Sequence, residues 1–413
     1  KALELNPNYA DAHYNLGNAF LSLNKLNSAV KSYEMTIKIK PKHADAHNNM
    51  GNSLKSLNQL SEAIKCYENA IEINAHFDDA YNNLGLAFED LGRNDDAVFN
   101  FKMAIKFNPK SYEAHTNFGN ILATCFNQYD EALISFKNAI KINANYAAAY
   151  LNLGNVYSLL DKLDDSLECY EKAMLINSDL DSLMGVIYAK INLCNWDNIE
   201  SLLEDAKVKI NNNNNVIDPW GLMGLFDNLL IQKQVTKLLI KNDYPISHDF
   251  SLLNPYPKHP KIRIGYFSAD FREHPVGYLT AELYELHDRD HFEIHAFSFG
   301  KATNDELNLR IKAGVDHFHN VESMSHQEIA ELARSLEIDI AVDLGGLTGK
   351  ARTDVFAMSA APIQLSYIGY LGTMGADYYD YLIADPIMIP KESQKYYAEK
   401  IVYLPSFQVN DST

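Results

Sequence analysis

The feature that most constrains this chain is an internal repeat of about 34 residues in its first 176 positions. Glycines recur at intervals of 34, 34, 34 and 35 residues, at Gly17, Gly51, Gly85, Gly119 and Gly154. A unit of this length is too small to bury a hydrophobic face alone, so it must stack on its neighbours. The chain therefore begins with a repeat array.

Three further registers run in step with the glycines. One holds small residues (Ala29, Ala63, Ala97, Ala132, Ser166), one holds aromatic rings (Tyr33, Tyr67, Phe101, Phe136, Tyr170), and one is mostly alanine (Ala70, Ala104, Ala139, Ala173, with Thr36 as the exception). Small residues let two helices approach closely, and we expect each ring to fill the gap to the next helix pair. The pattern is typical of about five α-helical tetratricopeptide (TPR) repeats over residues 1–176.

A fifth register is not explained by packing. Each repeat carries an asparagine two residues before its glycine: Asn15, Asn49, Asn83, Asn117 and Asn152. Asparagine is a mediocre helix former, and its amide both donates and accepts hydrogen bonds. This asparagine ladder either grips the backbone of an extended peptide or is a common residue of such helices, and the pattern alone leaves both readings open.

Composition excludes several classes of function. The formal net charge of -18 disfavours nonspecific binding to nucleic acid or to an anionic membrane. The four cysteines are scattered without metal-ligand spacing, so no metal site is predicted from them. No apolar run approaches the length of a membrane span. We expect a cytoplasmic protein; the chain opens as if inside an earlier helix, so its true amino terminus is expected to be missing.

Residues 177–257 keep a helical pattern but lose the register, and they form a predicted transitional region in which Trp196 and Trp220 are expected to anchor a core.

From residue 258 the pattern of residues changes. Short β-branched and aromatic runs alternate with helical stretches, which predicts a parallel, doubly wound sheet. The predicted strands are 261–268, 293–299, 338–344, 363–369, 381–385 and 402–404.

Ligands bind beyond the carboxyl ends of such strands, so the loops after them are candidate sites. The first loop contains His274, which either acts as a general base or sugar-hydroxyl partner or is an ordinary surface histidine, and loop position alone leaves both readings open. Two glycine-rich loops follow later strands, one with Gly345, Gly346 and Thr348 and the other with Gly369. Glycines let backbone amides approach a phosphate or a sugar closely, although neither loop matches a known phosphate-binding pattern.

The repeats and the loops after the predicted strands together resemble a known protein family. The repeats followed by KIRIGYFSADFREHPVGYL, AVDLGGLTGKAR and AAPIQLSYIGYLGTMGADYYDYLIAD resemble the O-GlcNAc transferase and SPINDLY family of glycosyltransferases. The resemblance implies a Rossmann-like amino-terminal half of a GT-B enzyme, which transfers a sugar, usually GlcNAc from UDP-GlcNAc, to Ser or Thr of proteins. It implies no metal and no cofactor other than the nucleotide sugar as donor substrate.

The resemblance also assigns roles to residues. It makes His274 catalytic or substrate-positioning, places Ile368, Gly369 and Leu371 near the donor sugar, and favours a peptide-binding role for the asparagine ladder. The partners implied are acceptor proteins in the TPR groove and a nucleotide sugar, with no nucleic acid and no membrane; a homo-oligomer stays open.

Two departures from the family pattern bear on the donor. Gly345-Gly346-Leu347-Thr348 replaces Asn-Gly-Tyr-Thr or Thr-Gly-His-Thr, and Leu371 replaces a proline. The SPINDLY branch of plants transfers fucose, so the donor sugar is left open. The second Rossmann-like half is expected beyond Thr413, and residues 1–413 alone are expected to be inactive. The alternative function is a TPR interaction scaffold with a non-catalytic α/β domain.

Overall fold

The computed structural model describes residues 2–212, 219–246, 256–257, 259–348 and 351–406. The chain divides into two compact units, residues 1–206 and 207–413, which are considered separately below. The predicted transitional region, 177–257, is shared between them.

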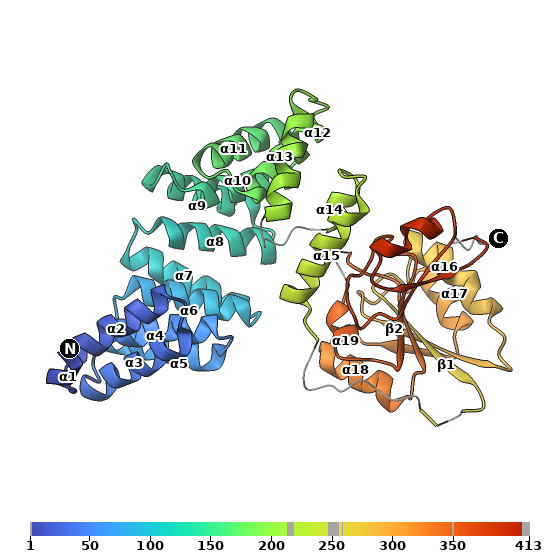
Figure 1. The fold of residues 1–413 in the computed structure, drawn as a ribbon, viewed down its shortest axis with the longest axis horizontal. Coiled ribbons are helices and arrows are strands. Elements are labelled where there is room, and N and C mark those ends of the chain that lie inside the picture. Colours follow the sequence, from blue (N-terminus) through green and yellow to red (C-terminus); the bar gives the residue numbers. More distant parts are fainter. Residues whose placement is uncertain (1, 213–218, 247–255, 258, 349–350, 407–413) are drawn as a thin grey trace. The chain divides into compact units, whose positions relative to one another are not determined.

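The first unit consists of antiparallel helix pairs, drawn from blue to green in Figure 1. After the short α1 (Ala2–Leu5), the first helices of the five pairs are α2 (Ala10–Ser22), α4 (Ala44–Ser56), α6 (Asp78–Asp90), α8 (Tyr112–Cys125) and α10 (Ala147–Leu159). Their second helices are α3 (Leu26–Ile39), α5 (Leu60–Ile73), α7 (Asn94–Phe107), α9 (Tyr129–Ile142) and α11 (Leu163–Ile176). The helices α12 (Leu180–Asn192) and α13 (Ile199–Asn212) follow, and the boundary between the units falls within α13.

Each aromatic ring packs directly on the glycine of its own pair. A Cβ atom at Gly51 would lie 2.5 Å from the ring of Tyr67, and the other four glycines meet the corresponding rings at 2.5–2.8 Å. The ring contacts its own pair in addition to the next pair, as predicted: a Cβ atom at Gly185 of α12 would lie 2.6 Å from the ring of Tyr170. Tyr33 does share a small core with Ala46 of the next pair, so one ring joins both contacts.

The turns inside the pairs need one residue in the left-handed conformation. That residue has φ between 53° and 70° and is always asparagine, aspartate or glycine: Asn24, Asn58, Gly92, Asn127 and Asp161. Asparagine, aspartate and glycine tolerate this conformation better than other residues. The local sequence thus ends each first helix and starts the second at a fixed point.

The second unit is a seven-stranded parallel sheet with helices on both faces. Its strands are β1 (Ile262–Ser268), β2 (Phe292–Ser298), β3 (His317–Asn320), β4 (Ile340–Asp343), β5 (Ile363–Ser366), β6 (Tyr381–Ala384) and β7 (Lys400–Tyr403). The strand order is β3-β2-β1-β4-β5-β6-β7, and every pairing is parallel. The predicted doubly wound sheet is confirmed.

Strand β3 was missed from the sequence. It is a short edge strand of sequence His-Phe-His-Asn, without the apolar run that marks the buried strands. It pairs with β2 only, from His295 opposite His317 to Ser298 opposite Asn320.

Alternate residues of β1 and β2 point to two separate cores. Ile264, Tyr266, Ile294 and Ala296 pack against α16 (Pro275–Leu286) and α17 (Glu306–Gly314). Phe267 and Phe297 pack on the other face with α18 (His326–Ser335) and α19 (Thr353–Ala357). Figure 1 shows these two helix layers flanking the sheet.

The helices before the sheet belong to this unit as well. They are α14 (Pro219–Met223) and α15 (Leu229–Asp243), and the short 3-10 helix η1 (Lys391–Tyr396) lies later in the chain. Lys233 of α15 donates to the carbonyl of Lys395 at 2.8 Å, and Ile240 joins the core under α18 and α19. Part of the transitional region therefore completes the α/β core.

The prediction for Trp196 was wrong, because 62% of its surface is exposed. The side chain of Trp220 lies outside the described part of the structure. Among the described residues, no helix combines the length and the apolar character that a membrane span requires.

Candidate functional site

A cavity of about 1060 Å³ opens at the carboxyl ends of the central strands of the second unit. Its walls come from the loops after β1, β4 and β5, from the start of α16, and from Pro219, Leu239 and Tyr244 before the sheet. Strands β1 and β4 are neighbours whose connections run to opposite sides of the sheet. This is the switch point at which doubly wound sheets bind their ligands.

His274 lines this cavity as the residue that caps the start of α16. Its Nδ1 accepts a hydrogen bond from the backbone N–H of Val276 at 3.3 Å. A neutral imidazole that accepts through Nδ1 carries its proton on Nε2. His274 is therefore arranged as a hydrogen-bond donor, and 36% of its side chain is exposed to a ligand.

Two charged residues of the same loop also line the cavity, and the sequence analysis did not single them out. Asp270 receives two hydrogen bonds from Arg272, at 3.2 and 3.0 Å, and lies 3.7 Å from Nδ1 of His274. The signal was available, since both residues follow directly after β1. With Arg272 and the positive end of the α16 dipole, this wall can receive an anionic ligand.

The glycine-rich loop after β4 is fixed by a buried carboxylate. Oδ1 of Asp343 accepts from the N–H groups of Gly345 and Gly346, both at 2.9 Å, and its Oδ2 accepts from the hydroxyl of Tyr379. Burial raises the pKa of Asp343, and the three hydrogen bonds oppose that rise. Asp343 is fully enclosed and serves to hold the loop in place.

The loop after β5 carries a strained residue. Ile368 has φ of 64°, and a hydrogen bond of 2.8 Å from Gly369 N–H to the Tyr367 carbonyl closes a three-residue turn around it. Such turns are rare, and positive φ is an outlier for a β-branched residue. The turn brings Ile368 and Gly369 to the cavity.

Gly369 also explains why the two glycine-rich loops lie so close together. A Cβ atom on Gly369 would stand 2.0 Å from the backbone oxygen of Leu344 in the loop after β4. A backbone atom cannot move away as a side chain can, so only glycine fits. The two loops therefore form one continuous wall.

A second buried carboxylate holds the end of this wall. Glu399 accepts from the hydroxyl of Thr373 at 2.8 Å and from the N–H groups of Met374 and Gly375. Burial raises the pKa of Glu399, and these hydrogen bonds oppose the rise. The sequence analysis gave this residue no role.

Most of the predicted donor-site residues gather at the cavity. Its lining includes His274, Gly345, Thr348, Ile368 and Gly369. The lining does not include Gly346 or Leu371. Gly346 has φ of 58° and lies against Tyr370, and Leu371 is 38% exposed. Gly349 and Lys350 of the loop after β4 lie outside the described residues.

The asparagine ladder lies in the first unit, with each asparagine at the sixth position of a first helix. Asn15 is exposed and the other four are half-buried, so none points into the closed interior of a helix pair. Among the described residues, hydrogen bonds across repeats are found for three of them. Asn49 donates to Asn18 at 3.1 Å, Asn83 to Asn48 at 3.0 Å and Asn117 to Asn82 at 2.9 Å.

Asn49 is also bonded to Tyr14 and Asn48, at 3.2 and 3.3 Å, so both its amide nitrogen and its carbonyl oxygen are engaged. For Asn83 and Asn117 the bond across repeats uses the amide nitrogen alone, so the carbonyl oxygen and a second N–H remain for another partner. The ladder therefore ties neighbouring repeats together and still presents polar groups at regular intervals.

Comparison with known protein families gives matches in both units. Residues 226–413 match the glycosyl transferase family 41 model. Tetratricopeptide repeat models match residues 1–23, 17–58, 51–92, 78–111, 127–161 and 147–180.

Two curated proteins and one solved structure are similar to parts of this chain. SEC of Arabidopsis thaliana, named as a probable UDP-N-acetylglucosamine–peptide N-acetylglucosaminyltransferase, is 40% identical over 152 residues, which are 37% of this chain and 16% of that protein. SPINDLY of Oryza sativa, named in the same way, is 30% identical over 156 residues, 37% of this chain and 17% of that protein. A solved O-GlcNAc transferase mutant of Thermobaculum terrenum is 21% identical with a TM-score of 0.41, covering 88% of this chain and 58% of that one.

The matched segments thus span about a sixth of each of these two curated relatives. The repeat array, the doubly wound sheet, the family model matches and the two curated relatives point to the same group of proteins. The chain belongs to the O-GlcNAc transferase and SPINDLY family, with TPR repeats followed by a family 41 glycosyltransferase domain.

Proposed function

We propose that the protein containing this chain transfers a sugar from a nucleotide donor to Ser or Thr of protein acceptors. The observation that carries the proposal is the cavity at the switch point of the sheet, which brings together His274, Arg272, the start of α16 and the two glycine-rich loops. A large, mostly apolar pocket with a few converging polar groups suits a small-molecule substrate. The names of the relatives favour UDP-GlcNAc as the donor.

In the proposed reaction the acceptor hydroxyl attacks the anomeric carbon, a new C–O bond forms, the bond to the nucleotide diphosphate breaks, and the hydroxyl proton passes to the departing diphosphate. The leaving diphosphate gains negative charge at this moment. Arg272, the α16 dipole and Nε2–H of His274 stand where they can stabilise such charge. Because Nδ1 of His274 accepts from Val276, we assign His274 the role of a hydrogen-bond donor and not that of a general base.

The asparagine ladder is proposed to hold the acceptor. Extended peptide offers one N–H and one C=O per residue, and the unused amide groups of the ladder can pair with both. Such binding does not depend on the side chains of the acceptor, so it would tolerate different acceptor sequences.

A second candidate function is supported by two observations. The loop after β4 lacks the aromatic or histidine usual in the family, and Leu371 stands in place of a proline. In this reading the TPR groove recruits a partner protein and the α/β unit is a non-catalytic scaffold.

The two candidates are separated by a mass-shift assay with the complete gene product. Acceptor peptides are incubated with a panel of sugar nucleotides that includes UDP-GlcNAc and GDP-fucose. A mass increase of one N-acetylhexosamine per modified hydroxyl is expected with UDP-GlcNAc alone. An increase with GDP-fucose only would change the donor, and no increase with any sugar nucleotide while peptide still binds would favour the scaffold.

A further inference from the structure

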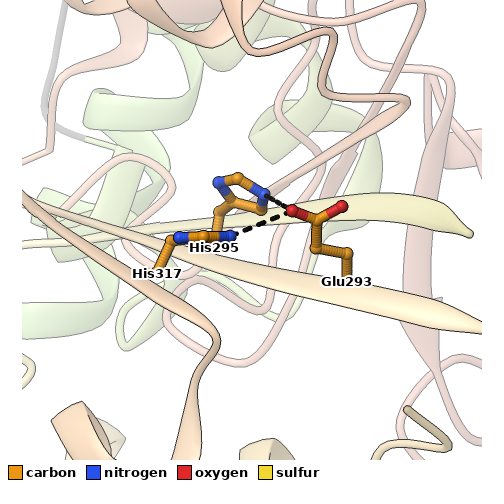
Figure 2. Close-up of side chains that lie close together, drawn as sticks. All are labelled: Glu293, His295 and His317. Carbon is orange, nitrogen blue, oxygen red and sulfur yellow. Dashed lines mark hydrogen bonds and ion pairs between the residues drawn. The ribbon is translucent and has the colours of Figure 1, made fainter.

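A cluster of histidines and a glutamate lies at the free edge of the sheet, outside the cavity described above. Glu293 and His295 are alternate residues of β2, so their side chains share one face of the strand. His317 of the edge strand β3 pairs directly with His295. Figure 2 shows both imidazole rings directed at the carboxylate of Glu293.

The distances between these groups are those of a metal site. Oε1 of Glu293 lies 3.0 Å from Nε2 of His317 and 3.4 Å from Nε2 of His295. Bond lengths of about 2.0–2.1 Å in a tetrahedral zinc site place neighbouring ligand atoms roughly 3.3 Å apart. All three ligand atoms lie within 4.8 Å of one another.

One nitrogen of the cluster, Nε2 of His295, lacks a hydrogen bond in the described part of the chain. Nε2 of His295 is buried and has no hydrogen-bond partner among the described residues, and only 3% of the side chain is exposed. A buried polar atom without a hydrogen bond is costly, and this nitrogen has only the Glu293 carboxylate beside it at 3.4 Å among the residues that the structure describes, so its position needs an explanation. A bound cation supplies one.

The surrounding residues orient the ligands as metal sites require. Nδ1 of His295 lies 3.1 Å from Nε2 of His319, and a hydrogen bond donated from Nδ1 leaves the Nε2 lone pair of His295 free. Nε of Arg263 donates to Oε2 of Glu293 at 3.3 Å, which leaves Oε1 for the cation. Ligand-orienting partners of this kind are typical of protein metal sites.

We propose that Glu293, His295 and His317 bind a borderline divalent cation of the Zn²⁺ class and thereby fasten the edge strand β3 to β2. Two imidazoles and one carboxylate suit zinc better than magnesium or calcium, which prefer oxygen ligands. His317 is 49% exposed, so the ion can enter from solvent and keep water as a fourth ligand. The site lies on β2 and β3, away from the cavity at the ends of β1, β4 and β5, and it takes no part in the proposed transfer.

The test is calorimetric titration of the full chain with Zn²⁺, together with the visible absorption of bound Co²⁺. One tight site per chain with tetrahedral Co²⁺ bands is expected. Glu293→Gln and His317→Gln should each weaken this site at least about 100-fold, and His319→Gln about 10–100-fold because it only orients His295. These results would support the site.

The matched control is His291→Gln, which removes a histidine of the same unit that is 74% exposed and pairs with Asp288. It should leave the tight site unchanged. Hydrogen exchange gives a second readout: Zn²⁺ should slow exchange in β3 of the wild type and of His291→Gln, but not of His317→Gln. Equal Zn²⁺ affinity in the wild type and in His317→Gln, or no tight site at all, would overturn the proposal.

Discussion

The two units of this chain differ in whether their key packing contacts are repeated. The TPR unit repeats one contact five times, a ring on the glycine of its own helix pair. The α/β unit uses contacts that occur once, such as Gly369 against the Leu344 carbonyl or Asp343 beneath Gly345 and Gly346. The comparison teaches that stability in the first unit is distributed, whereas in the second unit the same few residues support both the fold and the candidate site.

The largest effect on stability is expected from Tyr67→Ala in the TPR unit. Tyr67 is fully buried against Gly51, and removal of a buried aromatic side chain costs about 3–5 kcal/mol. Denaturation followed by hydrogen exchange in each unit should show the loss in the repeats around α5 and little change in the sheet.

Tyr67→Phe is the matched control, because Phe101 and Phe136 occupy the same register in later repeats. It removes only the 2.8 Å hydrogen bond to Asn52, for about 0.5–1.5 kcal/mol. Equal losses in both units after Tyr67→Ala would contradict the idea of distributed stability.

The second prediction concerns chemistry in the α/β unit. In the complete gene product, His274→Ala should lower kcat about 10²–10³-fold, the usual loss when one donor to developing charge is removed. The fold should stay intact, with a loss of stability of about 0.5–2 kcal/mol because the hydrogen bond that caps α16 is removed. Its role as a donor would be refuted by wild-type kcat in this variant.

The third prediction contrasts two glycines. Gly369→Ala should cost about 1–3 kcal/mol and weaken donor binding, because the new methyl group meets a backbone oxygen that cannot move. Gly224→Ala, with its nearest atom 3.9 Å away, is the control and should be close to neutral. Chemical denaturation and sugar-nucleotide titration measure the two effects.

The fourth prediction tests the asparagine ladder without disturbing the bonds between repeats. Within the described residues, no hydrogen bond is found for the side chain of Asn15 or Asn152. Replacement of either residue by alanine therefore leaves the bonds between repeats intact. A lost peptide hydrogen bond of about 0.5–1.5 kcal/mol corresponds to a roughly two- to twelvefold rise in KM for the acceptor. The KM for the donor should not change.

Two exposed asparagines on second helices, Asn69 and Asn138, serve as controls for the ladder. Their replacement by alanine should alter neither KM. A ladder variant that raises both KM values equally would argue against a role in holding peptide.

The smallest effect is a pH dependence confined to the sheet. Burial raises the pKa of Asp343 above 3.8, so the folded state holds this proton more tightly than the unfolded state. Its contribution to stability is therefore present at low pH and is lost as the pH rises through the folded pKa. Asp343→Asn keeps an acceptor for Gly345 and Gly346. In this variant the free energy of unfolding should depend less on pH over the same range. Urea denaturation at several pH values checks it, and an unchanged slope would count against the raised pKa.

Sequence reasoning succeeded where a physical constraint repeats or where a strand is long and apolar. The glycine and ring registers fixed the helix pairs, and the apolar runs predicted six of the seven strands. It failed at β3, whose sequence His-Phe-His-Asn lacks any apolar alternation. The Glu-x-His and His-x-His pairs that meet at this edge were therefore not recognised as one cluster.

The candidate site was predicted in part for a similar reason. Loop position after a strand was enough to indicate His274 and Gly345 as candidates, and the family resemblance added Ile368. It does not reveal which groups face the cavity, because that depends on the strained turn at Ile368 and on the support given by Asp343 and Glu399. Asp270 and Arg272 were passed over for lack of this geometric information.

The longer fourth repeat has a consequence for how such arrays change over time. Helix α8 has 14 residues where the other first helices of the pairs have 13, yet Phe136 still meets Gly119 at 2.8 Å and the left-handed turn residue is still an asparagine, Asn127. The extra residue is absorbed within one pair and does not propagate into the next. An insertion inside one helix pair can therefore be accommodated without redesign of the neighbouring pairs, because each pair contacts only its neighbours.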